Sequence, residues 1–109
     1  MTQTRPIRVH ERDLLDHLLI RLGLDPNAYQ INEVYEYEGG KMGSISLGLA
    51  DADNYAGDLI QVEYIDIDDV PVVITLTHDH QNQLLDLDFW KTDFSKLLQY
   101  PKPEELRFA

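Results

Sequence analysis

The first clear pattern along the chain is a stripe of leucines with helical spacing. Residues 11–22, ERDLLDHLLIRL, carry apolar side chains three and four positions apart, which places them on one face of an α-helix. Gly23 follows as a natural helix end, and the sequence therefore predicts a helix over 11–22. The order Asp25-Pro26-Asn27 predicts a short helical turn next, with the Asp25 side chain capping it. The stripe consists of Leu14, Leu15, Leu18, Leu19 and Leu22.

From residue 31 the hydrophobic period changes to two, which is typical of β-strands. Strands are predicted over 31–38, 44–49, 59–65, 70–77 and 83–90. Pro71 fits the start of its strand, where a missing N–H costs least. Residues 51–58, DADNYAGD, have the composition of a loop. Residues 94–98, FSKLL, are predicted to form a short C-terminal helical turn.

These elements predict an α+β fold in a single domain over residues 1–109. One N-terminal helix packs on an antiparallel meander of four to five strands, because short loops favour antiparallel neighbours. Alternation along each strand assigns every side chain to one face of the sheet. The face under the helix is expected to hold Tyr35, Tyr37, Ile45, Leu47, Val62, Ile74, Leu76, Leu85 and Leu87. The opposite face is expected to hold Glu36, Glu38, Ser44, Ser46, Glu63, Thr75, Thr77, Asp86 and Asp88, and no cation.

The charge of the chain makes this second face its most unusual surface. The net charge is −11, and residues 31–89 carry thirteen carboxylates against one cation, Lys41, while both ends of the chain are nearly balanced. An acidic surface repels nucleic acid and anionic membranes, so neither is expected as a partner. Two interpretations stay open. The acidity keeps the protein soluble and monomeric, or it forms a docking face for a basic protein partner.

Few residues form a pattern that carries chemistry. The loop that begins at Asp51 resembles a calcium loop, but Ala56 stands where glycine is required and Val62 where the closing glutamate is required. His78 and His80 have the spacing of a metal-binding pair without a third ligand. The paired carboxylates of the strands lack a pocket that would separate their pKa values. We therefore expect no enzyme activity, no bound metal and no cofactor, with a metal enzyme at the two histidines as a minor alternative.

Two absences in the sequence concern its compartment. The chain contains no cysteine, which excludes disulfides and thiolate sites. The N-terminal residues lack the apolar run of a secretory signal, and no apolar stretch approaches the roughly 20 residues of a membrane span. A cytoplasmic location is the expectation.

One aromatic residue differs from the other five tyrosines of the chain. Tyr55 lies among aspartates in the predicted loop 51–58, which is the setting of a contact anchor rather than of a core residue. Together with the acidic face, it completes the expected partner-binding set. That set consists of Glu36, Glu38, Asp53, Tyr55, Glu63, Asp86 and Asp88.

Several short motifs carry a resemblance to a known family. They are Gly39-Gly40-Lys41-Met42-Gly43-Ser44, the acidic turn 66–69, and Leu85-Asp86-Leu87-Asp88-Phe89-Trp90-Lys91 followed by Asp93-Phe94-Ser95 and Pro101. The chain resembles an uncharacterised family of small bacterial proteins with a Gly-Gly-Met-Gly-Ser turn and a Leu-Asp-x-Trp-Lys-x-Asp-Phe-Ser ending. It departs from that pattern at Lys41, which interrupts the glycine turn, and at Lys96, where proline is common. In this motif Trp90 is expected to close the core, with Phe94 and Leu97 beneath it and Lys91 paired locally with Asp93.

The resemblance extends to function only by association. Small proteins of this kind are similar to the immunity proteins encoded beside bacterial polymorphic toxins. The leading hypothesis is therefore a cytoplasmic immunity-type inhibitor that binds a basic toxin directly. The competing hypothesis is a stand-alone structural or regulatory domain whose acidity serves solubility. The sequence leaves the oligomeric state open.

Overall fold

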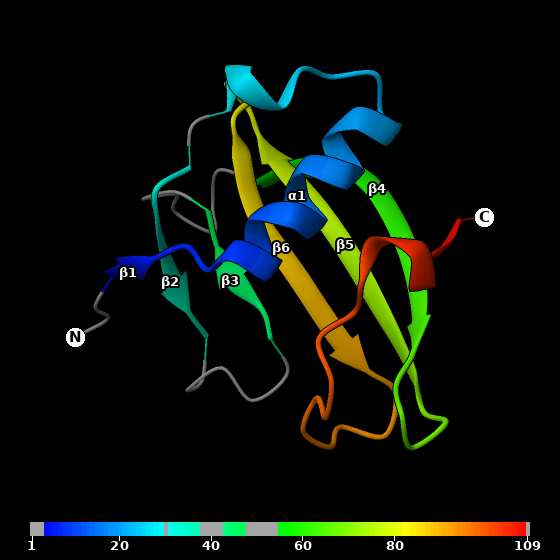
Figure 1. The fold of residues 1–109 in the computed structure, drawn as a ribbon. Helices are drawn as coiled ribbons and strands as arrows, with labels where there is room; N and C mark the ends of the chain where they lie inside the picture. The colour runs from blue at the N-terminus through cyan, green and yellow to red at the C-terminus, as the bar shows by residue number, and fades with distance from the viewer. Residues whose placement is uncertain (1–3, 30, 38–42, 48–54, 109) are drawn as a thin grey trace.

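Residues 4–29, 31–37, 43–47 and 55–108, which the computed structural model describes, form a seven-stranded antiparallel sheet with one α-helix on one face (Figure 1). The α+β class expected from the sequence is confirmed. The helix is α1 (Val9–Arg21), and 3₁₀ turns cover Pro26–Ala28 and Pro103–Glu105. The strands are β1 (Thr4–Pro6), β2 (Glu33–Glu36), β3 (Ile45–Ser46), β4 (Tyr55–Ile65), β5 (Pro71–Asp79), β6 (Leu84–Lys91) and β7 (Arg107–Phe108).

The order of strands across the sheet is β1-β2-β3-β6-β5-β4-β7, which is not the simple meander expected. Consecutive strands are neighbours within β1-β2-β3 and within β4-β5-β6, but β3 pairs with β6 instead of β4. The prediction was wrong here because short turns determine the pairing of β4, β5 and β6, whereas β3 is separated from β4 by a longer connection. Two edge strands, β1 and β7, were also missed, because segments of three and two residues show no periodicity.

The core lies between α1 and the sheet. All of the leucine stripe except Leu22 is fully buried, and Leu22 packs against the core from its margin. The inward positions predicted for the central strands are confirmed for Val62, Ile74 and Leu87. The helix-covered face therefore follows the predicted periodicity in β4, β5 and β6. The buried cluster consists of Leu14, Leu15, Leu18, Leu19, Val34, Ile45, Leu47, Val62, Tyr64, Val72, Ile74, Leu76, Leu84, Leu87, Phe89 and Leu106.

Both ends of α1 are fixed by hydrogen bonds. The helix begins two residues earlier than predicted, and Glu11 Oε1 accepts a bond of 2.9 Å from the Arg8 N–H, which precedes the first helical residue. At the other end, Gly23 has φ 77° and the N–H groups of Gly23 and Leu24 bond to the carbonyls of Ile20 and Leu19. This is the Schellman arrangement that favours glycine. The following turn begins at Pro26, and Asp25 caps it as predicted.

The helical turn predicted over 94–98 does not form. These residues run without regular structure beside the core, and the 3₁₀ turn lies further on, at Pro103–Glu105. The reason is the buried carboxylate of Asp66, which accepts hydrogen bonds from the N–H groups of Leu98 and Gln99. Backbone groups satisfied by a side chain from elsewhere in the chain do not need helical partners. Leu97 and Tyr100 pack against the core from this segment.

The structure explains why position 43 of the glycine-rich motif is a glycine. Its φ is 95°, and a Cβ atom at this position would lie 3.1 Å from Leu97 Cδ2 and 3.5 Å from the Phe89 ring. Both the backbone conformation and the close approach therefore require glycine here. The other glycines of this motif lie outside the described residues.

Candidate functional site

Among the described residues no helix covers the second face of the sheet, and the register of the strands defines which residues lie on it. Residues paired across neighbouring strands point to the same side of a sheet. These pairs form three rows across the sheet. The first row contains Tyr35, Ser46 and Asp86, and the pair Thr77–Asp58 continues it. The second row contains Asp88, Thr75 and Gln61, and the third contains Trp90, Val73, Glu63 and Arg107. We call these residues, with Tyr37, Tyr55 and Phe94 at their margins, the open face.

Large aromatic side chains are exposed on the open face. Trp90 is 47% exposed and Phe94 65%, and their ring centroids lie 6.3 Å apart. Tyr37 and Tyr55 are 44% and 47% exposed. The prediction that Trp90 closes the core with Phe94 beneath it was wrong. Trp90 follows Asp86 and Asp88 at intervals of two, so the same alternation that placed the aspartates outward also places the tryptophan outward.

Asp86 is the most constrained carboxylate of the open face. Its Oδ1 accepts a hydrogen bond of 2.7 Å from the Tyr37 hydroxyl. Burial raises the pKa of Asp86 above its usual value, the nearby Asp88 charge adds to this increase, and the Tyr37 bond opposes it. Burial and the bond to Asp86 likewise raise the pKa of Tyr37. The face therefore holds a carboxylate whose charge the folded protein disfavours.

Asp88 and Glu63 are the more accessible carboxylates. Both are exposed, and Asp88 Oδ1 accepts a bond of 3.0 Å from the Ser44 hydroxyl. The expectation that this face has no cation was wrong, because β7 places Arg107 opposite Glu63 at the edge of the sheet. Arg107 lies outside the acidic segment of the sequence, so only the pairing of β7 with β4 reveals it.

Tyr55 does not lie in a loop. It is the first residue of β4, opposite Asp79 of β5, and its hydroxyl donates a bond of 2.5 Å to Asp58 Oδ1. This bond raises the pKa of the Tyr55 hydroxyl above its usual value. Asp58, which the sequence did not single out, is paired with Thr77 and so belongs to the open face.

Glu36 lies on the opposite side from the one predicted. It is paired with Ile45, a core residue, and so faces the helix side of the sheet, where the Arg5 and Arg8 guanidinium groups bond to it. Tyr37 correspondingly points to the open face instead of the core. The assignment failed because Val34, not the tyrosines, is the buried residue of β2. The predicted site residues Glu38 and Asp53 lie outside the described residues, so the structure brings together Glu63, Asp86 and Asp88, with Tyr55 at the margin.

Arg5 also pairs with a second carboxylate on the helix side. Its guanidinium donates bonds of 2.8 and 2.6 Å to the two carboxylate oxygens of Glu11, a residue only 3% exposed. Burial acts to raise the pKa of Glu11, but the bonds from Arg5 and from the Arg8 N–H outweigh it, and the pKa lies below its usual value. Arg5 thus neutralises Glu11 and also Glu36, which the strand periodicity assigned to the opposite face of the sheet.

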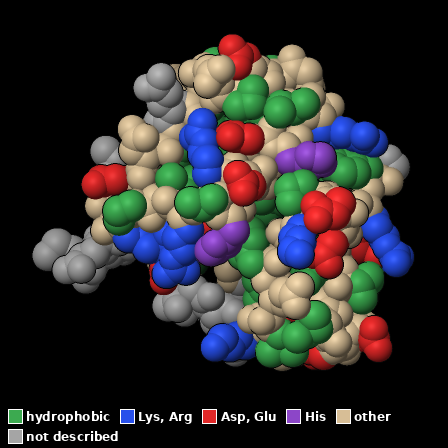
Figure 2. All heavy atoms as spheres, in the orientation of Figure 1, with side chains coloured by type: hydrophobic (Ala, Val, Ile, Leu, Met, Phe, Trp, Pro, Cys, Tyr) green, Lys and Arg blue, Asp and Glu red, His purple; other side chains and the backbone are tan. Residues whose placement is uncertain are grey.

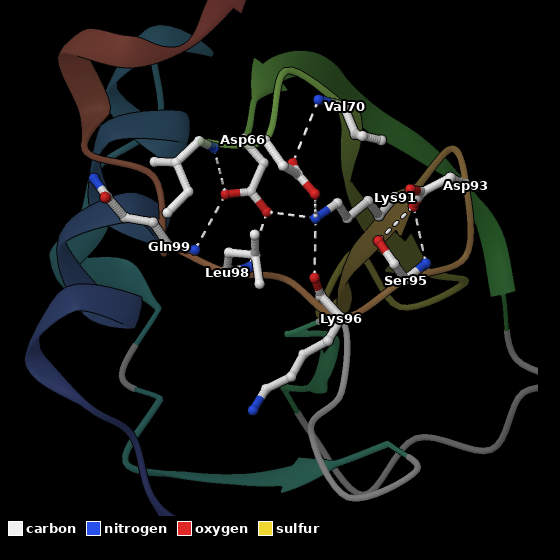
Figure 3. A network of polar contacts seen from close by, with 10 residues as sticks. Asp66, Val70, Lys91, Asp93, Ser95, Lys96, Leu98 and Gln99 are labelled. Atoms are coloured by element: carbon white, nitrogen blue, oxygen red, sulfur yellow. Dashed lines mark hydrogen bonds and ion pairs between the residues drawn. The ribbon is translucent and has the colours of Figure 1, made fainter.

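A buried polar cluster joins the end of β6 to the turn between β4 and β5 (Figure 3). Lys91 Nζ donates bonds to Asp66 Oδ2 (2.9 Å), Asp68 Oδ2 (2.7 Å) and the Lys96 carbonyl (3.0 Å). The predicted local pair of Lys91 with Asp93 does not form, and Asp93 instead accepts bonds from Ser95. All three ammonium protons of Lys91 have acceptors, so the cluster is structural rather than a free reactive amine.

The described residues hold no group of three or more His, Asp or Glu side chains arranged to bind a metal ion. His78 Nδ1 lies 3.0 Å from the Asp79 carbonyl, and His80 is exposed in the turn that follows. Within the same described part of the chain, no helix has the length and apolar character needed to cross a bilayer.

Comparison with known proteins identifies the family of the chain. Residues 4–101 match a family described as a domain of unknown function, DUF6984, and the chain belongs to this family. The match covers most of the chain, including every described strand except β7. No curated protein and no solved structure matches the chain.

Proposed function

We propose that this protein is a small acidic binding protein that holds a basic protein partner on the open face of its sheet. In the manner of an immunity protein, it would neutralise a cationic toxin in the cytoplasm by direct binding, without catalysis. The observation that supports this best is the combination of exposed Trp90 and Phe94 with the carboxylates of Asp86 and Asp88 on one face of the sheet.

The aromatic residues supply the features of binding anchors. Tryptophan and tyrosine are enriched among residues that dominate interface energies, because they bury a large area with few rotatable bonds. Trp90 lies two residues beyond Asp88 on the same strand, so a lysine or arginine side chain of a partner can contact both the ring face and the carboxylate. A basic surface with protruding cationic side chains therefore fits this face better than an apolar one.

The acidic residues supply attraction at a distance. Asp58, Glu63, Asp86 and Asp88 share the open face, and Arg107 lies only at its edge. An anionic face of this kind speeds association with a cationic partner and disfavours acidic competitors. Added salt should then slow association more than it speeds dissociation, whereas association that is independent of salt would contradict the electrostatic part of the proposal.

The experiment is affinity capture with a matched pair of variants. The full chain is immobilised and exposed to lysate of its own source that carries the neighbouring gene product, and bound polypeptide is eluted with a salt gradient. The test variant reverses two open-face charges, Glu63→Lys and Asp88→Lys. The control variant reverses two exposed charges elsewhere, Asp13→Lys and Glu104→Lys, so both variants change the net charge equally.

The proposal expects one stoichiometric basic polypeptide that the open-face variant releases at lower salt and the control variant retains. The captured polypeptide should lose its toxic activity when the wild-type chain is added back. Equal loss in both variants would mean that net charge alone matters. That result, or no stoichiometric partner at low salt, would favour a structural or regulatory domain whose acidity serves solubility.

A further inference from the structure

A second candidate site lies on the helix side of the sheet, where the start of α1 approaches the segment 96–100. It is a cavity of about 360 Å³, which falls within the roughly 300–1,000 Å³ of small-molecule pockets. Figure 2, which views this side, shows Lys and Arg side chains gathered with a histidine near the start of α1. The polar groups at its walls include Arg5, Arg8, His10, Lys96 and Tyr100.

The side chains that line the cavity carry a net positive charge, whereas the whole protein carries a net negative charge. Three cations line it against two carboxylates, Glu11 and Glu36, in a chain of net charge −11. Both carboxylates are already paired with Arg5. Arg8 makes only a long contact of 3.5 Å to Glu36, and the Lys96 ammonium has no bond within the described residues. Figure 3 shows the Lys96 side chain extending away from the buried cluster that holds its carbonyl.

The Tyr100 hydroxyl is the feature that the fold itself does not explain. It is buried and has no hydrogen-bond partner in the described part of the chain. The ring is held between His10, with centroids 4.5 Å apart, and Phe89, with centroids 5.3 Å apart. A buried hydroxyl without an acceptor is unfavourable, and no described residue supplies one here, so a bound anion is an acceptor that fits this donor.

We propose that this cavity binds a small oxyanion, the carboxylate or phosphate group of a small molecule. Arg8 and Lys96 supply the positive charge, His10 a ring nitrogen at the wall, and Tyr100 the buried donor that fixes the orientation of the anion. The cavity lies on the opposite side of the sheet from the open face. The ligand site and the partner site are therefore independent, and either proposal can fail without the other.

The test uses the purified full chain and two probes, inorganic phosphate and succinate, at constant ionic strength. Binding is followed by calorimetric titration and by the rise in melting temperature. Tyr100→Phe removes only the hydroxyl, and it should weaken binding by about tenfold, the effect of one hydrogen bond to an anion. Lys96→Gln should weaken binding by about fivefold. Lys102→Gln removes the same charge outside the cavity and should leave binding unchanged.

A second readout separates ligand binding from a structural role of the hydroxyl. Without anion, Tyr100→Phe should melt at or above the wild-type temperature, because it removes an unpaired buried donor. With anion, both proteins should gain stability, but the variant should need about ten times more anion than the wild type for the same gain. Saturation by phosphate alone would identify a phosphorylated ligand, and saturation by succinate alone would identify a carboxylate. No saturable binding of either probe, or equal losses in Lys96→Gln and Lys102→Gln, would overturn the proposal.

Discussion

Lys91 Nζ lies 2.9 Å from Asp66 Oδ2, and neither side chain is exposed to solvent. The carboxylate of Asp66 also accepts the N–H groups of Ile67, Leu98 and Gln99. Burial acts to raise the pKa of Asp66, but the bonds from Leu98 and Lys91 outweigh it, and the pKa lies below its usual value. This pair therefore connects β6, the turn between β4 and β5, and the C-terminal segment, and it keeps that segment over the core.

Replacing Asp66 should destabilise the protein far more than replacing another aspartate of the same turn. Asp66→Ala removes the buried carboxylate partner of the Lys91 ammonium, one of its three acceptors, and leaves two backbone N–H groups of the C-terminal segment without their acceptor. Breaking a buried ion pair from one side costs about 3–5 kcal/mol. Asp69→Asn is the control, because Asp69 is exposed with φ 64°, a conformation that asparagine tolerates. Urea unfolding should show a change of less than about 0.5 kcal/mol for this control. Equal effects would contradict the structural role of Asp66.

The depressed pKa values of Asp66 and Glu11 predict how stability depends on pH. Carboxyl groups of the unfolded chain titrate near pH 4. A lowered pKa in the folded state means that these groups stabilise the fold fully above that pH, and the stabilisation is lost as the pH falls through the folded values. Urea midpoints measured from pH 6 to pH 2 should therefore fall below about pH 4. Glu11→Gln should make this fall less steep, and an unchanged slope would contradict the assignment.

The sequence predicted those parts of the fold that depend on local periodicity. The leucine stripe of α1 and the alternation in β4, β5 and β6 follow directly from spacing. Contacts between distant segments were not predictable in this way: Lys91 and Asp66 are 25 residues apart, and Arg5 and Glu36 are 31 apart. These contacts also change the meaning of the charge pattern, because they neutralise Glu36, Asp66 and Asp68 within the fold. The open face is consequently less acidic than the middle of the sequence, and its aromatic residues contribute more to its character.

Two neighbouring aromatic residues of β6 should separate stability from binding. Phe89 is 2% exposed on the helix side, and Trp90 is 47% exposed on the open face. Phe89→Ala should cost about 3–5 kcal/mol of unfolding free energy, as expected for an aromatic residue removed from a core. Trp90→Ala should cost less than about 1 kcal/mol but should abolish capture of the basic partner. Denaturation and the capture assay together check both effects. Strong destabilisation by Trp90→Ala would mean that the tryptophan is structural.

Asp86 should cost the protein stability at neutral pH. Its pKa is raised by burial and by the charge of Asp88, so the folded state disfavours its ionised form. The effect of pH on stability is opposite to that expected for Asp66. The Asp86 carboxyl group favours folding at acid pH, and this stabilisation is lost as the pH rises through its pKa in the folded state. Asp86→Asn keeps an oxygen that can accept the Tyr37 hydroxyl and removes the charge. At pH 7 we expect a gain of less than about 1 kcal/mol, because solvent screens a half-buried carboxylate.

Asp86→Asn also tests whether the carboxylate that lowers stability at neutral pH takes part in partner binding. The stability gain of Asp86→Asn should vanish below about pH 4, where the wild-type carboxyl is also protonated, and urea unfolding at pH 7 and pH 3 measures the difference. Partner capture at pH 7 should weaken, because the charge that the folded protein disfavours is one that a cationic partner would stabilise. A variant that is more stable and still binds at full strength would show that Asp86 is not part of the partner surface. A variant that is less stable at pH 7 would contradict the raised pKa itself.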